Sequence, residues 1–422
     1  MPSIFKCIDC RKSYPLGFKT RCECGGLLEV KHEFRERIQR EIFDKRADSK
    51  NPLIKSGVWR FKELVYPELD NNHIITKPEG NTNLYTSKLI SSFVGTSNLY
   101  LKHEGENPTG SFKDRGMTVG VSEAKRLGMT IVACASTGNT SSSLSSYAAT
   151  AGLKCIVFLP EGRITYGKLA QTLAYGATVI QVKGSFDDAM RIVQQVSEEL
   201  SIYLLNSINP WRIEGQKTIV FELIQQLNWK PPDWIILPAG NLGNTSAFGK
   251  ALTELEELDL IDEKPRLAAI QAEGADPFYR LWLTGSSLLE PNSEAKTIAS
   301  AIRIGNPVSW KKALFAIKNT NGVVEHVSDQ EIMDSKIVVD RSGIGCEPAS
   351  AASVAGAKKL LDSGVIDKGE KIVCILTGNI LKDPDSTIRY FEGDLPGIKP
   401  NFLNSLKIVE PSIIDVRKIL EL

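Results

Sequence analysis

The feature that most constrains the fold is an alternation of short apolar runs with stretches of helical spacing, which begins near residue 98. Its first part predicts four pairs of a strand and a helix. The expected strands are 98–104, 130–136, 154–160 and 177–182, and the expected helices are 112–128, 139–152, 166–176 and 186–200. Continuous apolar strands separated by helices are typical of a parallel sheet with helices on both faces.

A second α/β unit follows in the C-terminal half. Its expected strands are 233–240, 267–273 and 371–379, and its expected helices are 245–258 and 347–364. A chain of 422 residues exceeds the size at which one hydrophobic core keeps growing. The sequence therefore predicts two α/β domains with a ligand cleft between them.

Charge and composition narrow the partners. The chain has 51 basic and 50 acidic residues, and this balance argues against nucleic acid or an anionic membrane as the main partner. No apolar run reaches the length of a membrane span, and "MPSIFKCIDC" lacks the apolar core of a signal peptide, so we expect a cytoplasmic protein. The four histidines share no close motif, which disfavours a histidine metal site or a Ser-His-Asp hydrolase.

Four cysteines crowd the first 31 residues: Cys7, Cys10, Cys22 and Cys24. Four thiolates form a normal structural zinc set, although the second pair is C-x-C where C-x-x-C is usual. Zinc is favoured over free thiols or a redox pair. We expect such a metal to fold a segment that lacks its own core and to take no part in catalysis. Nearby basic residues leave a nucleic-acid role for the segment as the alternative.

Two glycine-rich or hydroxyl-rich turns follow expected strands. The loop Gly240–Asn244 in "LPAGNLGN" precedes a helix, so its amides and the helix N-terminus form a phosphate cradle by construction. The alternative is a tight strand-to-helix turn. In "ASTGNTSSS", Ser136, Thr137 and Asn139 open another helix. They are either helix-capping residues or donors that face the cleft.

The stretch "NPTGSFKDRG" places Lys113 directly after a Pro-Thr-Gly-Ser turn, where a loop enters a helix. A lysine in a dry cleft loses its proton more easily, and the resulting amine can attack a carbonyl and form a Schiff base. The alternative is an ordinary surface lysine with an extended side chain, and physical reasoning alone favours that alternative.

A linked set of motifs resembles the threonine synthases. The set comprises "PTGSFKDRG", "ASTGNTSSS", "NSINPWRIEGQKT", "PAGNLGNTSA", "AIRIGNPVSW", "EPASAASVAG" and "LTGN" with "KDPD". These motifs occur in that family's order and cover roughly residues 50–390. Threonine synthases are fold-type-II pyridoxal-phosphate enzymes, related to the tryptophan synthase β-subunit, and the N-terminal cysteines resemble the zinc-ribbon start of archaeal members.

The resemblance implies an α/β architecture of two open, twisted-sheet domains plus a small zinc-ribbon-like segment. The expected parts are the ribbon at 1–31, an arm with the first part of the large domain at 32–104, a small mobile domain at 105–205 and the large cofactor-binding domain at 206–422. A homodimer is also implied.

The resemblance also assigns cofactor-binding residues. Lys113 would hold pyridoxal phosphate covalently, and Asn139 would bond its ring 3-hydroxyl. Thr377 would face the pyridine nitrogen and leave it largely neutral, since a hydroxyl lacks the counter-charge of a carboxylate. The cofactor phosphate would lie on the amides of Gly240, Asn241, Leu242, Gly243 and Asn244.

The implied reaction converts O-phospho-L-homoserine and water to L-threonine and phosphate, by γ-elimination and β-addition of water with Lys113 as the base. The substrate brings a second phosphate, so the site needs a second anion pocket. Its expected residues are Ser111, Ser136, Thr137, Asn206 and Arg212. The alternative activity is a β-replacement on O-phosphoserine, as in cysteate synthase.

Two positions depart from the family pattern. Asn83 in "EGNTNLY" stands where a proline is usual, which puts the local loop geometry in doubt. Asn379 and Ile380 replace a more usual His-Gly, but Thr377 keeps its place.

Overall fold

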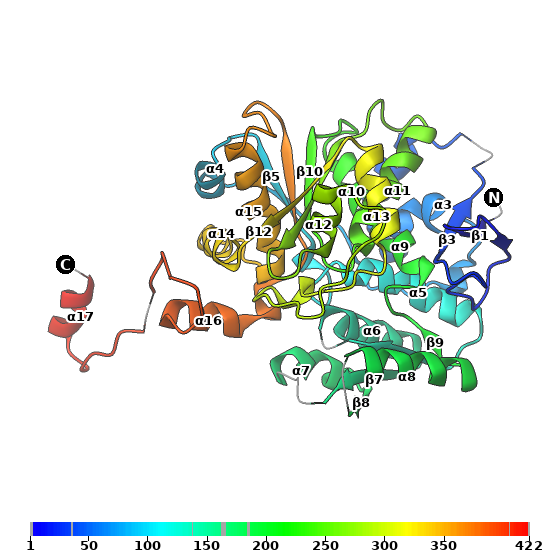
Figure 1. Ribbon diagram of the computed structural model, residues 1–422, viewed down its shortest axis with the longest axis horizontal. Helices are drawn as coiled ribbons and strands as arrows, with labels where there is room; N and C mark the ends of the chain where they lie inside the picture. The colour runs from blue at the N-terminus through cyan, green and yellow to red at the C-terminus, as the bar shows by residue number, and fades with distance from the viewer. Residues whose placement is uncertain are drawn as a thin grey trace.

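The computed structural model describes residues 3–34, 37–136, 138–161, 166–183, 186–404 and 406–420. Figure 1 shows two α/β layers stacked on each other, each consisting of one sheet and the helices that cover it. A small N-terminal sheet lies at one side and a C-terminal arm at the other.

The larger sheet has six strands in the order β12-β11-β10-β13-β5-β4. Only the pairing of β4 with β5 is antiparallel; the other four pairings are parallel. The strands are β4 (Leu84–Tyr85), β5 (Leu99–His103), β10 (Trp234–Pro238), β11 (Arg266–Ala272), β12 (Val323–Val327) and β13 (Ile372–Leu376). The expected strands at 98–104, 233–240, 267–273 and 371–379 are confirmed.

Successive residues of the central strand β10 point to opposite faces of this sheet, as strand geometry requires. Ile235 and Leu237 join a core with α10 (Thr218–Gln226), α11 (Gly243–Glu257) and α13 (Trp310–Asn319). Trp234 and Ile236 join a second core on the other face. That face is covered by α4 (Lys88–Val94), α14 (Asp329–Arg341) and α15 (Pro348–Asp362), while α12 (Pro277–Thr284) lies beside β12.

The smaller sheet is wholly parallel, with the order β8-β7-β6-β9. Its strands are β6 (Ile131–Ala135), β7 (Lys154–Pro160), β8 (Thr178–Val182) and β9 (Tyr203–Leu204). Its helices are α5 (Lys113–Arg126), α6 (Asn139–Ala151), α7 (Tyr166–Ala174) and α8 (Phe186–Glu199). Alternate residues of β6 enter two separate cores, so this sheet is covered on both faces, as predicted.

The N-terminal strands form a third, antiparallel sheet in the order β2-β1-β3. They are β1 (Ser3–Cys7), β2 (Ser13–Tyr14) and β3 (Leu28–His32). Phe5, Leu28 and Val30 of this sheet are buried in the same core as α10 and α11. The following arm contains α1 (Arg40–Ala47), α2 (Pro52–Lys55) and α3 (Lys62–Val65).

A short helix, α9 (Pro210–Gln216), connects the two halves of the molecule and packs against α5, α11 and β3. In Figure 1, α5 and α9 lie between the two layers. The chain ends with α16 (Pro384–Glu392) and α17 (Ile413–Leu420), and Figure 1 shows α17 well apart from the rest. In the described part of the chain, no helix is long and apolar enough to cross a bilayer.

Candidate active site

Lys113 is the first residue of α5, and the turn that precedes it is held by the next residue of the helix. The buried carboxylate of Asp114 accepts hydrogen bonds from the backbone N–H of Thr109 at 2.7 Å and from its hydroxyl at 2.6 Å. The same carboxylate accepts a bond from the Ser143 hydroxyl of α6 at 2.5 Å. Asp114 therefore ties the Pro-Thr-Gly-Ser turn to the helix that begins with Asn139.

The same turn is attached to the C-terminal end of β13. The backbone N–H of Phe112 donates to the Thr377 carbonyl at 3.0 Å, and the N–H of Asn379 donates to the Gly110 carbonyl at 2.9 Å. Lys113 and Thr377 are thereby brought to one edge of the six-stranded sheet. Ligands of open α/β sheets bind at this carboxyl edge.

The environment of Lys113 favours the unprotonated amine. Burial, followed by the positive charge of Arg212, lowers the pKa of Lys113 to about 7, while Glu347 acts in the opposite direction. The Lys113 nitrogen lies over the Phe112 ring, 4.0 Å from the ring centroid. At neutral pH a large fraction of this side chain is therefore a free amine, which is the nucleophilic form.

Arg212 of α9 is a buried guanidinium, and within the described chain it has no carboxylate partner. Among the residues that the structure describes, its Nη1 donates only to the Leu205 carbonyl, at 3.4 Å, and its Nε has no acceptor. Burial lowers its pKa to about 10. A buried charge without a counter-ion is strongly unfavourable, so this position suits an anion supplied from outside the chain.

The loop Gly240–Asn244 enters the N-terminus of α11, the fifteen-residue helix that begins at Gly243. Leu242 has a left-handed backbone with φ of 63°, and a Cβ added at Gly240 would lie 3.0 Å from the Cα of Ile302. Both side-chain polar atoms of Asn244 and the hydroxyls of Thr245 and Ser309 are buried without a partner in the described chain. Unpaired donors at a helix N-terminus fit a phosphate group.

The side chain of Asn241 connects the loop Gly240–Asn244 to the motifs "NSINPWRIEGQKT" and "AIRIGNPVSW". The Asn241 amide donates to the Ser207 hydroxyl at 2.7 Å, and its oxygen accepts the N–H of Val308 at 2.7 Å.

Glu347 is a site residue that the sequence reasoning missed. Its carboxylate is buried, burial raises its pKa, and it accepts bonds from the Asn139 amide at 3.0 and 3.1 Å. Its backbone N–H donates to the Gly378 carbonyl, next to Thr377. An acid before proline at the start of a helix is common, so only its place in "EPASAASVAG" could have drawn attention to it.

The hydroxyl of Thr377 is oriented by a neighbour on α15. The Ser350 hydroxyl lies 3.0 Å from that of Thr377 and accepts the N–H of Gly378 at 2.9 Å. Ser111 is buried and its hydroxyl has no partner among the described residues, so it is available to a ligand.

Two further predicted anion-site residues are placed differently. The Asn206 amide is paired with the backbone of Ala135: it accepts the Ala135 N–H at 2.9 Å and donates to the Ala135 carbonyl at 3.0 Å, which leaves one amide N–H for a ligand. The Ser136 hydroxyl accepts the N–H of Gly138 at 3.3 Å, as a helix-start residue does. Thr137 lies outside the described residues.

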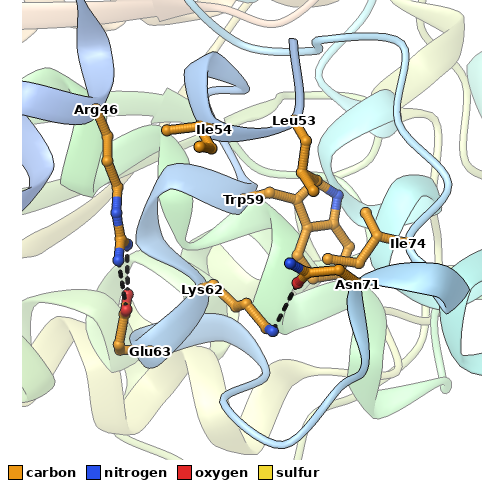
Figure 2. Close-up of a pocket in the computed structure, with 8 residues that line it drawn as sticks. All are labelled: Arg46, Leu53, Ile54, Trp59, Lys62, Glu63, Asn71 and Ile74. Carbon is orange, nitrogen blue, oxygen red and sulfur yellow. Dashed lines mark hydrogen bonds and ion pairs between the residues drawn. The ribbon is translucent and has the colours of Figure 1, made fainter. Parts of the chain in front are cut away.

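Two cavities of about 300 and 310 Å³ open on the N-terminal arm, and none of the predicted cofactor-binding or substrate-binding residues lines either of them. Figure 2 shows that the polar groups of the first are paired with each other. Arg46 binds Glu63 through two contacts of 2.6 Å, and Lys62 donates to Asn71 at 2.8 Å. This pocket therefore offers a ligand little unsatisfied charge.

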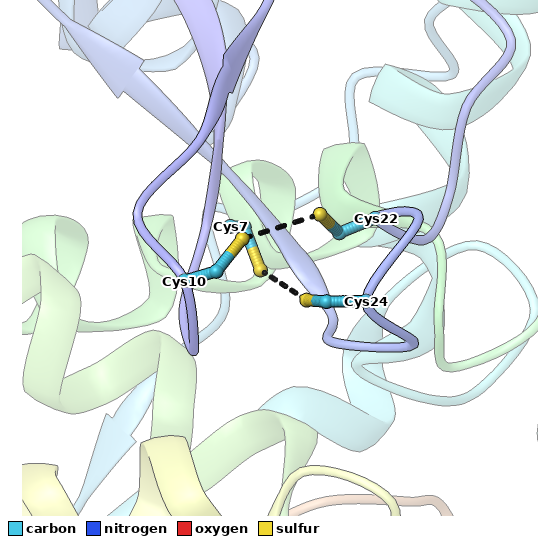
Figure 3. Close-up of side chains that lie close together, drawn as sticks. All are labelled: Cys7, Cys10, Cys22 and Cys24. Carbon is cyan, nitrogen blue, oxygen red and sulfur yellow. Dashed lines mark hydrogen bonds between the residues drawn. The ribbon is translucent and has the colours of Figure 1, made fainter.

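The four N-terminal cysteines converge from two loops, as Figure 3 shows. Their sulfur atoms all lie within 4.8 Å of one another, and the Cys7–Cys24 and Cys10–Cys22 separations are 3.5 and 3.4 Å. Tetrahedral zinc with bonds of about 2.3 Å requires sulfur separations of this order. Hydrogen bonds from the Tyr14 hydroxyl, 3.0 Å away, and from the Cys24 backbone lower the pKa of Cys22 to about 6. The C-x-C pair is thus compatible with a four-thiolate metal site.

Comparison with known proteins agrees with this geometry. A family model described as pyridoxal-phosphate dependent enzyme matches residues 75–378. The chain is 51% identical to a threonine synthase of Methanocaldococcus jannaschii, over 92% of this chain and 95% of that protein. It is 46% identical to a threonine synthase of Methanosarcina acetivorans, over 91% and 93%. Among solved structures, maize serine racemase matches with a TM-score of 0.63 at 21% identity, over 80% of this chain and 97% of that one, which shows the fold alone.

Proposed function

The chain belongs to the threonine synthases of the pyridoxal-phosphate-dependent enzyme family, and from this premise we propose that it converts O-phospho-L-homoserine and water into L-threonine and phosphate. It is then a carbon–oxygen lyase that releases phosphate from Cγ of its substrate and adds water at Cβ. The observation that supports this activity best is the pair formed by Lys113 and Arg212. An amine with a pKa of about 7 lies within the electrostatic reach of a buried guanidinium that has no carboxylate partner in the described part of the chain.

Pyridoxal phosphate, when bound, withdraws electrons from the substrate amine and so acidifies the neighbouring C–H bonds. The residues present fit this cofactor. Lys113 would hold its aldehyde carbon, Asn139 its 3-hydroxyl and Thr377 its ring nitrogen. The phosphate would lie on the loop Gly240–Asn244, where Asn244 and Thr245 have unused polar atoms. Because Thr377 carries a hydroxyl, the ring nitrogen would stay largely neutral.

Proton transfer is the task of Lys113. Because its pKa is lowered, the amine is free near neutral pH and can act as a base. It would accept a proton from Cα of the substrate and, in a later step, a proton from Cβ. Arg212 would bind the dianionic phosphate of the substrate through charge-assisted hydrogen bonds, with Ser111 as a nearby donor. Ser136 and Thr137 remain proposed donors at the start of α6. Asn206 would act by holding the end of β6 at Ala135, through the paired contacts described above.

The N-terminal cysteines would hold a structural zinc ion. We expect a homodimer that works in the cytoplasm and needs no nucleic-acid or membrane partner. Gel filtration with light scattering tests the oligomeric state, and metal analysis of the purified protein tests the zinc.

The decisive experiment measures phosphate release from O-phospho-L-homoserine and, in parallel, from O-phospho-L-serine. We expect threonine and phosphate in equal amounts from the first substrate and little turnover of the second. The Lys113→Ala variant is the matched control and should not turn over. Turnover of phosphoserine alone, or undiminished turnover by Lys113→Ala, would overturn the proposal.

A further inference from the structure

The ribbon with the four cysteines contacts the helix that carries Arg212 through a buried polar chain. His32, at the end of β3, lies with its Nε2 2.9 Å from the Oε2 of Glu214, and both side chains are fully buried. Glu214 belongs to α9, two residues after Arg212. The other ring nitrogen of His32 lies 2.8 Å from the Ser3 hydroxyl of β1. One histidine therefore joins both long strands of the ribbon to α9.

Apolar and backbone contacts reinforce this connection. The rings of Phe5 and Trp211 meet edge-on at 5.9 Å between centroids, which joins β1 to α9. Lys250 of α11 donates to the Val30 carbonyl at 2.6 Å and also pairs with Glu214. The ribbon thus touches the helix of the anion site and the helix that follows the phosphate loop.

On its opposite side, α9 is in backbone contact with α5. A Cβ at Gly215 would collide with the carbonyl oxygen of Arg115. A Cβ at Gly116 would lie 3.0 Å from the carbonyl oxygen of Arg212. Because the two backbones approach so closely at Gly116 and Gly215, a movement of α9 toward α5 would displace α5. Helix α9 is held between the ribbon on one side and the helix of Lys113 on the other.

The cysteines determine whether β1 and β3 can hold this position. Cys7 is the last residue of β1 and pairs with Leu28, the first residue of β3, while Ser3 pairs with His32 at the other end. A metal bound at Cys7 therefore secures the strand pair that presents His32. A segment this small has little core of its own, so it depends on such a crosslink.

We propose that the metal-bound ribbon is a positioning element of the substrate anion site, and that His32 is the positioning residue that fixes Glu214 and thereby α9 and Arg212. The proposal rests on the proposed function only for the identity of the anion. It differs from the expectation that the ribbon takes no part in catalysis. Metal binding and anion binding are then coupled, and the coupling must act equally in both directions.

The test uses the zinc-loaded holoenzyme, with inorganic phosphate as the anion. Zinc release to a chromogenic chelator is timed with and without phosphate, and phosphate affinity is measured by calorimetry. We expect phosphate to retard zinc loss, and His32→Ala to lower phosphate affinity by about fivefold or more, the range of ordinary site-to-site coupling. His32→Gln keeps a hydrogen bond to Glu214 and should restore much of the affinity.

A second ribbon contact supplies the control. Lys311 of α13 pairs with Asp9 at 2.7 Å on the surface and takes no part in the contacts between the ribbon and α9 described above, so Lys311→Ala should leave phosphate affinity unchanged. In turnover assays, His32→Ala should raise KM for phosphohomoserine and change kcat little. If phosphate does not change the rate of zinc release from the wild type, the proposal is overturned, even if no histidine variant folds. An unchanged phosphate affinity in His32→Ala would also overturn it. Neither measurement needs turnover, so failure of the proposed reaction would be recognised separately.

Discussion

Asn139 and Glu347 hold the two α/β layers together at the active site. The amide of Asn139, from the first residue of α6, donates to both carboxylate oxygens of Glu347, which precedes α15, at 3.0 and 3.1 Å. The residue that would contact the cofactor 3-hydroxyl is therefore aimed by an acid from the opposite sheet. The orientation of the Asn139 side chain therefore depends on the position of one layer relative to the other.

This pair predicts that Glu347→Ala lowers kcat/KM by about tenfold, or about 1.4 kcal/mol, because the Asn139 amide loses its only described acceptor. Glu347→Gln keeps a carbonyl oxygen for the same bond and should lose less. Steady-state kinetics on both variants measure the difference. Equal losses would show that the charge, rather than the hydrogen bond, matters at this position.

The pKa of Lys113 predicts a pH dependence for cofactor attachment. In the apoenzyme, only the free amine reacts with added pyridoxal phosphate, so the rate should rise with pH and reach half its maximum near pH 7. Arg212→Gln removes a positive charge that lowers this pKa, so the midpoint should move up. Glu347→Gln removes a charge that raises it, so the midpoint should move down. The growth of absorbance at each pH gives the midpoints, and two shifts of the same sign would contradict this account.

A buried charge cluster that includes Arg115 of α5 predicts a large loss of stability when its central carboxylate is neutralised. Glu222 binds Lys102 at 2.6 Å, Arg115 at 2.9 Å and Arg60 at 3.0 Å, and all four side chains are buried. Glu222→Gln leaves these cations short of counter-charge and should lower the free energy of unfolding by about 3–5 kcal/mol. The exposed pair Lys358–Asp362 on α15 is the matched control. Asp362→Asn should cost at most about 0.5 kcal/mol in the same urea titration.

Asn83 has a structural use that the family's proline could not supply. Its backbone N–H donates to Glu106 at 2.6 Å, and its side-chain amide donates to the same carboxylate at 3.1 Å. Asn83→Pro removes both donors and should destabilise the protein; because the site is exposed, the loss should be only about 1 kcal/mol. Thermal unfolding of Asn83→Pro beside Glu106→Gln measures the effect. A stabilised proline variant would show that the loop already has the geometry proline prefers.

The central parallel strands of the two larger sheets could be predicted from the sequence because they are buried on both faces, so each is a continuous apolar run; the two-residue strands β4 and β9 are too short to give such a run. The strand β12 was not predicted, since Glu325 and His326 interrupt its apolar pattern at the edge of the sheet. Edge strands need no continuous run, and periodicity alone misses them.

The active site shows the same limit. The turn before Lys113 drew attention to this residue, but only the family resemblance assigned it to the cofactor, and its lowered pKa depends on burial and on Arg212, about a hundred residues away in sequence. Glu347 looks like an ordinary acid at a helix start, and only the partner that folding brings to it, Asn139, marks it. The use of both Asn206 polar atoms by Ala135 likewise depends on the register of two strands.

The close approach of α5 and α9 at Gly116 and Gly215 matters for engineering this enzyme. Each glycine has only a hydrogen atom where other residues carry a side chain, so the two helices pack directly against each other. The helix that carries Lys113 and the helix that carries Arg212 therefore form one packed unit, called the block below. Libraries that aim to alter substrate preference can vary the loops around this block. Adding even a methyl group at either glycine should widen the gap between nucleophile and receptor, whatever the new residue contributes chemically.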